Sequence, residues 1–104
     1  RLLDDDTIEV EAPLDLTFAW LVQASHDIGD VTFLDRSAAL LQLVVQFVDE
    51  PVCQMIFDLQ GRAARGTTEV FCTIDSIEDR PPPDIAVVTR FVAQQLATTI
   101  DTWD

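Results

Sequence analysis

Residues 39–77 contain three consecutive stretches in which every second side chain is apolar. A period of two is typical of β-strands, because successive side chains of a strand point to opposite faces of the sheet. Polar or glycine-containing segments, 49–51 and 60–66, separate the three stretches and predict turns. This part of the chain is therefore expected to form three antiparallel strands, over 39–48, 52–60 and 67–77.

Pairing Val48 with Val52, and Cys53 with Cys72, places the apolar positions of all three stretches on one face. A shift by one residue would turn a whole strand over, so we expect this register to be firmly specified. The resulting face is the predicted core: Leu43, Val45, Phe47, Met55, Phe57, Val70 and Cys72. The two cysteines become neighbours on adjacent strands. We expect buried, reduced thiols, with a cross-strand disulfide as the alternative.

The opposite face of these strands is also apolar in its middle. Its predicted members are Leu40, Val44, Val48, Val52, Ile56 and Phe71, surrounded by Gln42, Gln46, Gln54, Asp58 and Glu69. A face of an antiparallel sheet that meets only water is mostly polar. The pattern therefore predicts an interface with another protein, most simply a homodimer around a two-fold axis. The alternative is that the N-terminal segment or the proline connector 81–83 covers this face.

The flanking segments predict strands over 7–11 and 30–35, and helices over 14–28 and from residue 85 to about residue 100. Pro13, Gly29 and Asp84 stand at helix ends, where these residue types are common. Residues 1–6 are short and acidic and are expected to fray. The chain is thus predicted to be one α+β domain, residues 1–104. Its antiparallel sheet has about five strands and two helices on one face, in the order strand, helix, four strands, helix.

The chain is strongly acidic, with 19 acidic and 6 basic residues and a net charge of −13. This charge disfavours partners that are themselves anionic, both nucleic acids and anionic membranes. No apolar run is long enough to span a bilayer, so no membrane insertion is expected. All basic residues are arginine. Two explanations stay open: a GC-rich genome that replaces lysine codons, or adaptation to high salt through hydrated carboxylates.

Residues with catalytic potential are few. His26 is the single histidine, and its place near the end of a predicted helix favours a surface role. No serine lies in a nucleophile elbow, and no glycine-rich phosphate loop is present. The carboxylates of residues 4–6, and of Asp27 with Asp30, lack EF-hand spacing and favour solvated clusters over Ca²⁺ sites. Asp58 is notable because it interrupts the second face. We predict no enzyme, no cofactor and no metal.

One local motif supports a resemblance. The segment from Val10-Glu11-Ala12-Pro13 to Phe18-Ala19-Trp20-Leu21 resembles the start of START-like and polyketide-cyclase-like proteins, which begin with a strand, Ala-Pro and a helix bearing tryptophan. The element order also resembles small helix-grip domains, such as those of bacterial envelope lipoproteins of the outer-membrane assembly type. The resemblance implies a long final helix against an antiparallel sheet, and it transfers no functional residue to this chain.

These observations predict a non-enzymatic protein-interaction module that self-associates through the second sheet face. The alternative is a protein that binds a small apolar ligand in a pocket between the C-terminal helix and the sheet.

The two explanations of the acidity differ in their dependence on salt. If the charge reflects a saline habitat, mutual repulsion of carboxylates weakens the fold at low ionic strength. The melting temperature should then keep rising with NaCl beyond the first few tenths molar, where simple screening is complete. A melting temperature that is flat up to molar NaCl would leave codon bias as the explanation.

Overall fold

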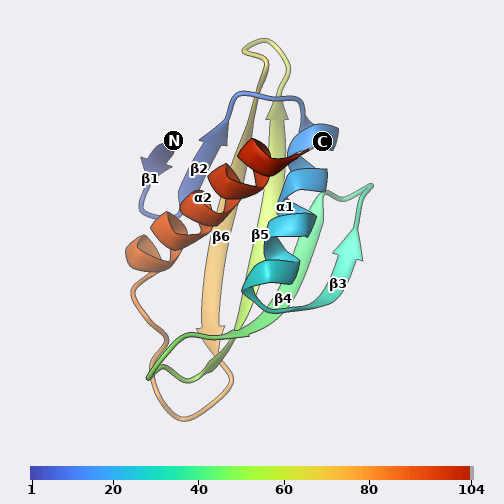
Figure 1. Ribbon diagram of the computed structural model, residues 1–104. Coiled ribbons are helices and arrows are strands. Elements are labelled where there is room, and N and C mark those ends of the chain that lie inside the picture. Colours follow the sequence, from blue (N-terminus) through green and yellow to red (C-terminus); the bar gives the residue numbers. More distant parts are fainter. Residues whose placement is uncertain (104) are drawn as a thin grey trace.

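The computed structural model describes residues 1–103 and shows an antiparallel sheet with two helices across one face (Figure 1). In chain order the elements are β1 (Leu2–Asp4), β2 (Thr7–Val10), α1 (Leu14–Ile28), β3 (Asp30–Asp35), β4 (Leu40–Gln46), β5 (Val52–Arg62), β6 (Thr67–Ser76) and α2 (Ile85–Thr102). The six strands lie in the order β1-β2-β6-β5-β4-β3. The predicted α+β class and element order are confirmed.

The sheet has six strands rather than five, because β1 forms where fraying was predicted. Leu2 pairs with Ile8 and Asp4 with Thr7 across an irregular register. All three residues of β1 are exposed, so the strand lacks the alternation of apolar and polar residues that identifies a half-buried strand. Pairing with β2 holds it at the edge of the sheet.

Local interactions set the ends of both helices. Pro13 precedes α1 with an extended backbone, and the N–H of Gly29 donates to the Ser25 carbonyl at its end. A side chain at Gly29 would overlap the Val44 carbonyl oxygen, so this close approach of α1 to β4 requires glycine. At the start of α2 the Asp84 carboxylate accepts from the Ala86 N–H at 2.9 Å, as its predicted capping role demands.

The register between β4 and β5 differs from the prediction by two residues. Leu43 lies opposite Met55 rather than Phe57, and Gln46 rather than Val48 lies opposite Val52. The strand ends at Gln46, and the connection to β5 contains Asp49 in the left-handed region, at φ 64°. An even shift leaves every side chain on its predicted face. Alternation therefore predicted the faces correctly, while the turn decided the register.

The register between β5 and β6 differs by four residues. Cys72 lies opposite Phe57, and Cys53 lies opposite Ser76. The hairpin is tighter than predicted, because β5 continues to Arg62 and Gly66, at φ 68°, completes the turn. The cysteines are thus about 13 Å apart along the strands, at ~3.3 Å per residue, well beyond the ~7 Å limit for a disulfide. The prediction that they are neighbours was wrong; both are free and buried.

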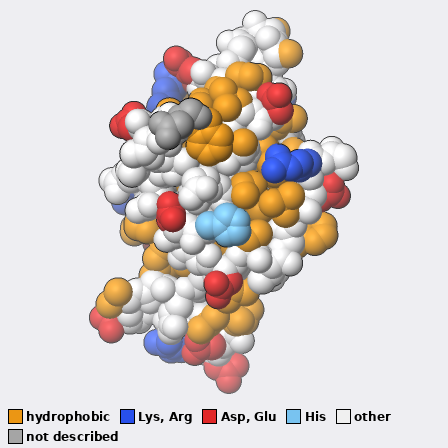
Figure 2. All heavy atoms as spheres, turned by 45° about the vertical axis from the view of Figure 1, so that its right-hand side comes forward, with side chains coloured by type: hydrophobic (Ala, Val, Ile, Leu, Met, Phe, Trp, Pro, Cys, Tyr) orange, Lys and Arg blue, Asp and Glu red, His pale blue; other side chains and the backbone are white. Residues whose placement is uncertain are grey.

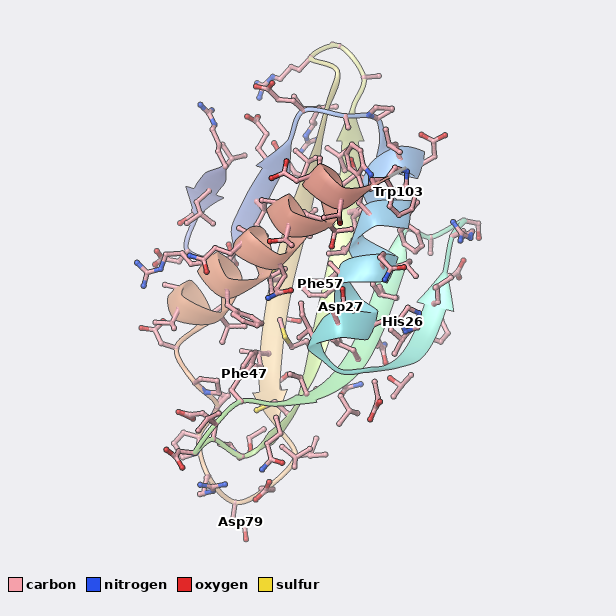
Figure 3. The ribbon with its side chains drawn as sticks, viewed as in Figure 1. His26, Asp27, Phe47, Phe57, Asp79 and Trp103 are labelled. Carbon is pink, nitrogen blue, oxygen red and sulfur yellow. The ribbon has the colours of Figure 1, made fainter. Side chains whose placement is uncertain are left out.

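The helices bury the face that the sequence predicted as core. Six of the predicted core residues are buried: Leu43, Val45, Met55, Phe57, Val70 and Cys72. They belong to one core cluster with buried residues of the helices, which are Phe18 and Leu21 of α1 and Val88, Val92 and Leu96 of α2. Phe57 lies on β5 beneath the helices (Figure 3). Phe47 is half-buried beyond the end of β4, and its ring meets that of Phe91 edge-on at 5.4 Å. Neither helix of the described chain is long and apolar enough to cross a membrane.

Replacing Phe57 by alanine should lower the free energy of unfolding by about 3–5 kcal/mol, the usual cost of truncating a buried aromatic side chain. Phe57 has no solvent exposure, whereas Phe33 on β3 is 45% exposed and serves as the matched control. Phe33→Ala should cost less than about 1 kcal/mol in the same urea titration followed by circular dichroism. Equal losses for the two variants would contradict the assignment of the buried face.

Neither cysteine should react with a thiol reagent in the native protein, and both should react after unfolding in urea. Burial raises the pKa of Cys72 to about 12 and also raises the pKa of Cys53, so the reactive thiolate is scarce at neutral pH. Labelling followed by intact-mass measurement counts the modified thiols. A disulfide in the non-reduced protein would contradict the register of β5 with β6.

Candidate functional site

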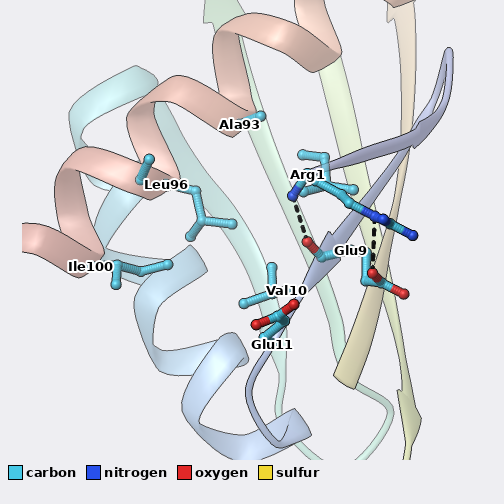
Figure 4. A pocket seen from close by; sticks show the side chains of 9 residues that line it. Arg1, Glu9, Val10, Glu11, Ala93, Leu96 and Ile100 are labelled. Atoms are coloured by element: carbon cyan, nitrogen blue, oxygen red, sulfur yellow. Dashed lines mark hydrogen bonds and ion pairs between the residues drawn. The ribbon is translucent and has the colours of Figure 1, made fainter. Parts of the chain in front are cut away.

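A groove lies between α2 and the strand β2 (Figure 4). Its volume is about 210 Å³, and its lining residues are Arg1, Ile8, Glu9, Val10, Glu11, Ala93, Leu96, Ala97 and Ile100. This is the region where the alternative function placed a pocket, between the C-terminal helix and the sheet. The groove opens to solvent along the side of the sheet near β1.

Small side chains on α2 create the space. Ala93 and Ala97 are four residues apart and therefore lie on one side of the helix. Leu96 and Ile100 line the same groove, while Ile8 and Val10 rise from β2 beneath it. Ile8, Val10 and Leu96 are buried, so the floor of the groove is apolar and well packed. The sequence signal that points to this groove is the pair of alanines in a helix otherwise faced with valine and leucine.

The rim of the groove is charged. Arg1 Nε lies 3.2 Å from Glu9 Oε1, and the backbone nitrogen of Arg1 donates to the Glu9 carbonyl at 2.7 Å. The Arg1 side chain is 74% exposed, so this ion pair contributes little stability. Glu11 is exposed at the mouth and forms no ion pair with any residue in 1–103. The groove thus combines an apolar floor with one uncompensated carboxylate.

A second hollow lies between the start of α1 and the connection from β3 to β4. The hollow has a volume of about 320 Å³, and its lining residues are Leu14, Asp15, Phe18, Arg36 and Ala39. The Arg36 guanidinium carbon lies over the Phe18 ring, 5.6 Å from the ring centroid. The guanidinium therefore already covers the apolar ring surface that a ligand would contact. This hollow is the weaker candidate for a ligand site.

The structure brings together most of the residues predicted for the second face. Leu40, Val44, Ile56 and Phe71 are half-buried on the outer face of β4, β5 and β6, and Val52 begins β5 on the same side. Val48 does not belong to the face, because it lies in the turn after β4 and is 89% exposed. The prediction for Val48 was wrong for the same reason as the register: β4 ends two residues early.

The second face is a checkerboard rather than a continuous apolar patch. Asp58 lies between Leu40 and Phe71 in one row, and Ile56 lies between Gln42 and Thr73 in the next. The Gln54 amide donates to Gln42 Oε1 at 3.0 Å, so the amides bridge adjacent strands. The predicted pairing of Val48 with Val52 would have placed Asp58 opposite Gln42, whereas in the structure Asp58 lies opposite Leu40. Self-association through this face stays a prediction.

The remaining candidates lie apart from both surfaces. His26 is exposed at the end of α1, next to Asp27 (Figures 2 and 3). Asp4 ends β1 and Asp6 lies in the turn to β2, where Asp6 accepts from the Thr7 hydroxyl. Within residues 1–103, no group of three or more His, Cys, Asp or Glu side chains has the spacing to hold a metal ion.

No family model matches the sequence, and no curated protein matches it. Among solved structures, the chain is similar to the di-domain ARO/CYC protein BexL from the BE-7585A biosynthetic pathway, with a TM-score of 0.49 and 14% identity. The alignment covers 91% of this chain and 42% of the BexL chain. At this TM-score the likeness assigns no activity or ligand to the chain.

One prediction is corrected: the sequence predicted that the chain is not an enzyme. The solved structure to which the chain is similar, BexL, is an ARO/CYC, so an enzyme is not excluded, although the likeness assigns no activity to this chain. Missing motifs exclude only the chemistries that require those motifs, so they were an insufficient basis for that prediction. The coarse fold prediction holds, since a long C-terminal helix lies across a curved antiparallel sheet in a helix-grip-like arrangement (Figure 1).

Proposed function

We propose that the protein binds a small, largely apolar molecule in the groove between α2 and β2. The observation that carries this proposal is the floor of buried Ile8, Val10 and Leu96 beneath an open volume of about 210 Å³. Ligand sites are typically concave and apolar, with a few polar groups that orient the ligand.

The size of the groove limits the ligand. A protein cavity of about 150 Å³ accommodates benzene, whereas drug-sized ligands occupy about 300–1,000 Å³. A volume of about 210 Å³ therefore suits a single ring with a short substituent, or a branched aliphatic group of similar size. Burying roughly 150 Å² of such a molecule at ~25 cal/mol per Å² stabilises the complex by about 4 kcal/mol, which corresponds to millimolar affinity.

Glu11 adds a chemical preference. Its carboxylate stands at the mouth without a cationic partner in the described chain, so it accepts a hydrogen bond from an amine or hydroxyl group of a bound molecule. An exposed ion pair adds about 0–1 kcal/mol, so an amine should bind only a few times more tightly than an uncharged analogue. The ligand class is thus a small apolar molecule, with a cationic or hydroxyl group preferred at one end.

The proposal is tested by titrating ¹⁵N-labelled protein with 2-phenylethylamine and with 2-phenylethanol. Amide shifts should concentrate in β2 and the C-terminal half of α2. Ala97→Leu fills the groove from an exposed helix position and should weaken binding by about tenfold or more, since a leucine side chain takes the ligand's place. Gln94→Leu adds the same side chain to an exposed position of α2 outside the groove and should leave binding unchanged.

Thermal melts of both variants establish that each remains folded. Unchanged binding by Ala97→Leu, or shifts that map to the Arg36 hollow, would show that the groove is not the ligand site. Glu11→Gln should abolish the preference for the amine over the alcohol and leave binding of the alcohol intact.

The open sheet face supplies a second candidate function, contact with a protein. The observation that favours it is a set of half-buried apolar side chains on a face that neither helix of residues 1–103 covers (Figure 1): Leu40, Val44, Ile56 and Phe71. Non-obligate protein interfaces are about as apolar as the rest of a protein surface, so a mixed apolar and polar face of this kind is compatible with an interaction site. The sequence predicts a second copy of the chain as the partner, and the charges on this face decide how well that partner suits it.

A further inference from the structure

The outer face of the sheet carries carboxylates that no cation neutralises. Four aspartates lie on this face, each opposite a residue of the neighbouring strand. The pairs are Asp30 with Val44, Asp35 with Leu40, Asp58 with Phe71, and Asp75 with Gln54. None of the four forms an ion pair within residues 1–103. The Ser37 hydroxyl and the N–H groups of Ala38 and Ser37 hold the pKa of Asp35 below its usual value, so this carboxylate stays charged to a lower pH than an ordinary aspartate.

The arginines lie outside the central rows of this face. Arg62 pairs with Glu69 at 2.9 Å near the end of the face, and Arg1 pairs with Glu9 on β2. Arg36 stacks on Phe18 of α1, and Arg80 pairs with Glu78 beyond β6. The two remaining arginines are Arg65, in the β5–β6 turn, and Arg90, on α2. The central rows of the outer face therefore contain carboxylates, amides and apolar groups, and no basic residue.

Apolar side chains fill the positions between these carboxylates. Ile56 occupies the centre, with Leu40, Val44 and Phe71 at the diagonal positions of the neighbouring strands. Diagonal neighbours are about 7–8 Å apart, close enough for one partner side chain to contact two of them. Phe33 extends the row of Ile56 onto the edge strand β3, where it is 45% exposed. A partner must therefore alternate apolar and cationic groups over short distances.

A second copy of this chain does not provide that alternation. Two-fold pairing of the face would bring two sets of Asp30, Asp35, Asp58 and Asp75 together, and like charges placed opposite each other in an interface are strongly unfavourable. The net charge of −13 repels a second copy at long range as well. For a basic partner both electrostatic effects become attractive. The negative charge of the chain accelerates its approach, and each carboxylate of the face meets a cation in the complex.

The dimensions of the face suit one helix. Four strands about 4.8 Å apart, and three rows of residues about 6.8 Å apart, measure roughly 14 Å by 14 Å between outer Cα atoms. An α-helix with its side chains is about 10–12 Å across and rises about 5.4 Å per turn, so two to three turns span the face. On its other side the same sheet already packs two helices (Figure 1).

We propose that the outer face of β3–β6 binds a basic amphipathic helix of a partner protein. Lysine or arginine side chains of that helix meet Asp30, Asp58 and Asp75, and its apolar side chains pack on Ile56, Val44 and Phe71. This inference rests on the second candidate function, that the face contacts a protein, and it is independent of ligand binding at the α2–β2 groove.

The probe is an amphipathic peptide of leucine, alanine and lysine, about 18 residues long so that a helix can form, with a scrambled peptide of equal composition as its control. Titration of ¹⁵N-labelled protein should shift amides of β4, β5 and β6, and the scrambled peptide should bind more weakly. The triple variant Asp30→Asn, Asp58→Asn and Asp75→Asn should weaken binding about tenfold, since it removes three cation contacts.

The matched control removes three charges elsewhere: Asp27→Asn, Asp79→Asn and Asp101→Asn, all exposed and outside the outer face. It should change the affinity less than about twofold if contact rather than net charge decides binding. Equal weakening by both triples would overturn the inference. Sedimentation that shows a dimer abolished by Val44→Glu with Ile56→Glu would keep the face as an interface but replace the helix with a second copy. No shifts in β4–β6 would contradict the interface itself.

Discussion

The burial of one face of β4, β5 and β6 beneath α1 and α2 is the interaction on which the other elements depend. Leu43, Met55 and Phe57 have no solvent exposure, and the apolar stripes of both helices close over them. Apolar burial of this kind supplies most of the free energy of folding in a chain of this size. Polar contacts then position individual segments. For example, the hydroxyls of Thr17 and Thr68 both donate hydrogen bonds to the Ala12 carbonyl, which joins the start of α1 to β6.

Both candidate sites follow from the number of helices available to cover the sheet. Six strands at about 4.8 Å measure roughly 24 Å from edge to edge, whereas two helices side by side cover roughly 20 Å. The helices therefore leave the edge strands β1 and β3 largely exposed, and the small side chains of Ala93 and Ala97 leave the groove between α2 and β2. Both helices of the part of the chain that the structure describes lie on the inner face, so the outer face is left without one (Figure 1). One constraint thus produces an apolar groove on one side and an open checkerboard on the other.

The excess of carboxylates gives these two surfaces a common chemical preference. Glu11 at the groove and Asp58 on the outer face both lack a cationic partner within the described chain. Most arginines in that chain are engaged, either with a glutamate or over an aromatic ring. Both proposals therefore invoke an occupant that combines apolar and cationic groups, a small molecule in the groove and a helix on the larger face.

The sequence by itself determined the class of the fold, the order of the elements and the face of each central strand, because side-chain alternation has a period of two and any even shift preserves it. It did not determine which residues lie opposite one another. The turns at Asp49 and Gly66 decided that, and so separated Cys53 from Cys72 and left Val48 outside the sheet. The groove likewise required the placement of α2 against β2, because Ala93 and Ala97 show only that one side of the helix is small, and the strand that this side faces depends on packing between residues far apart in the chain.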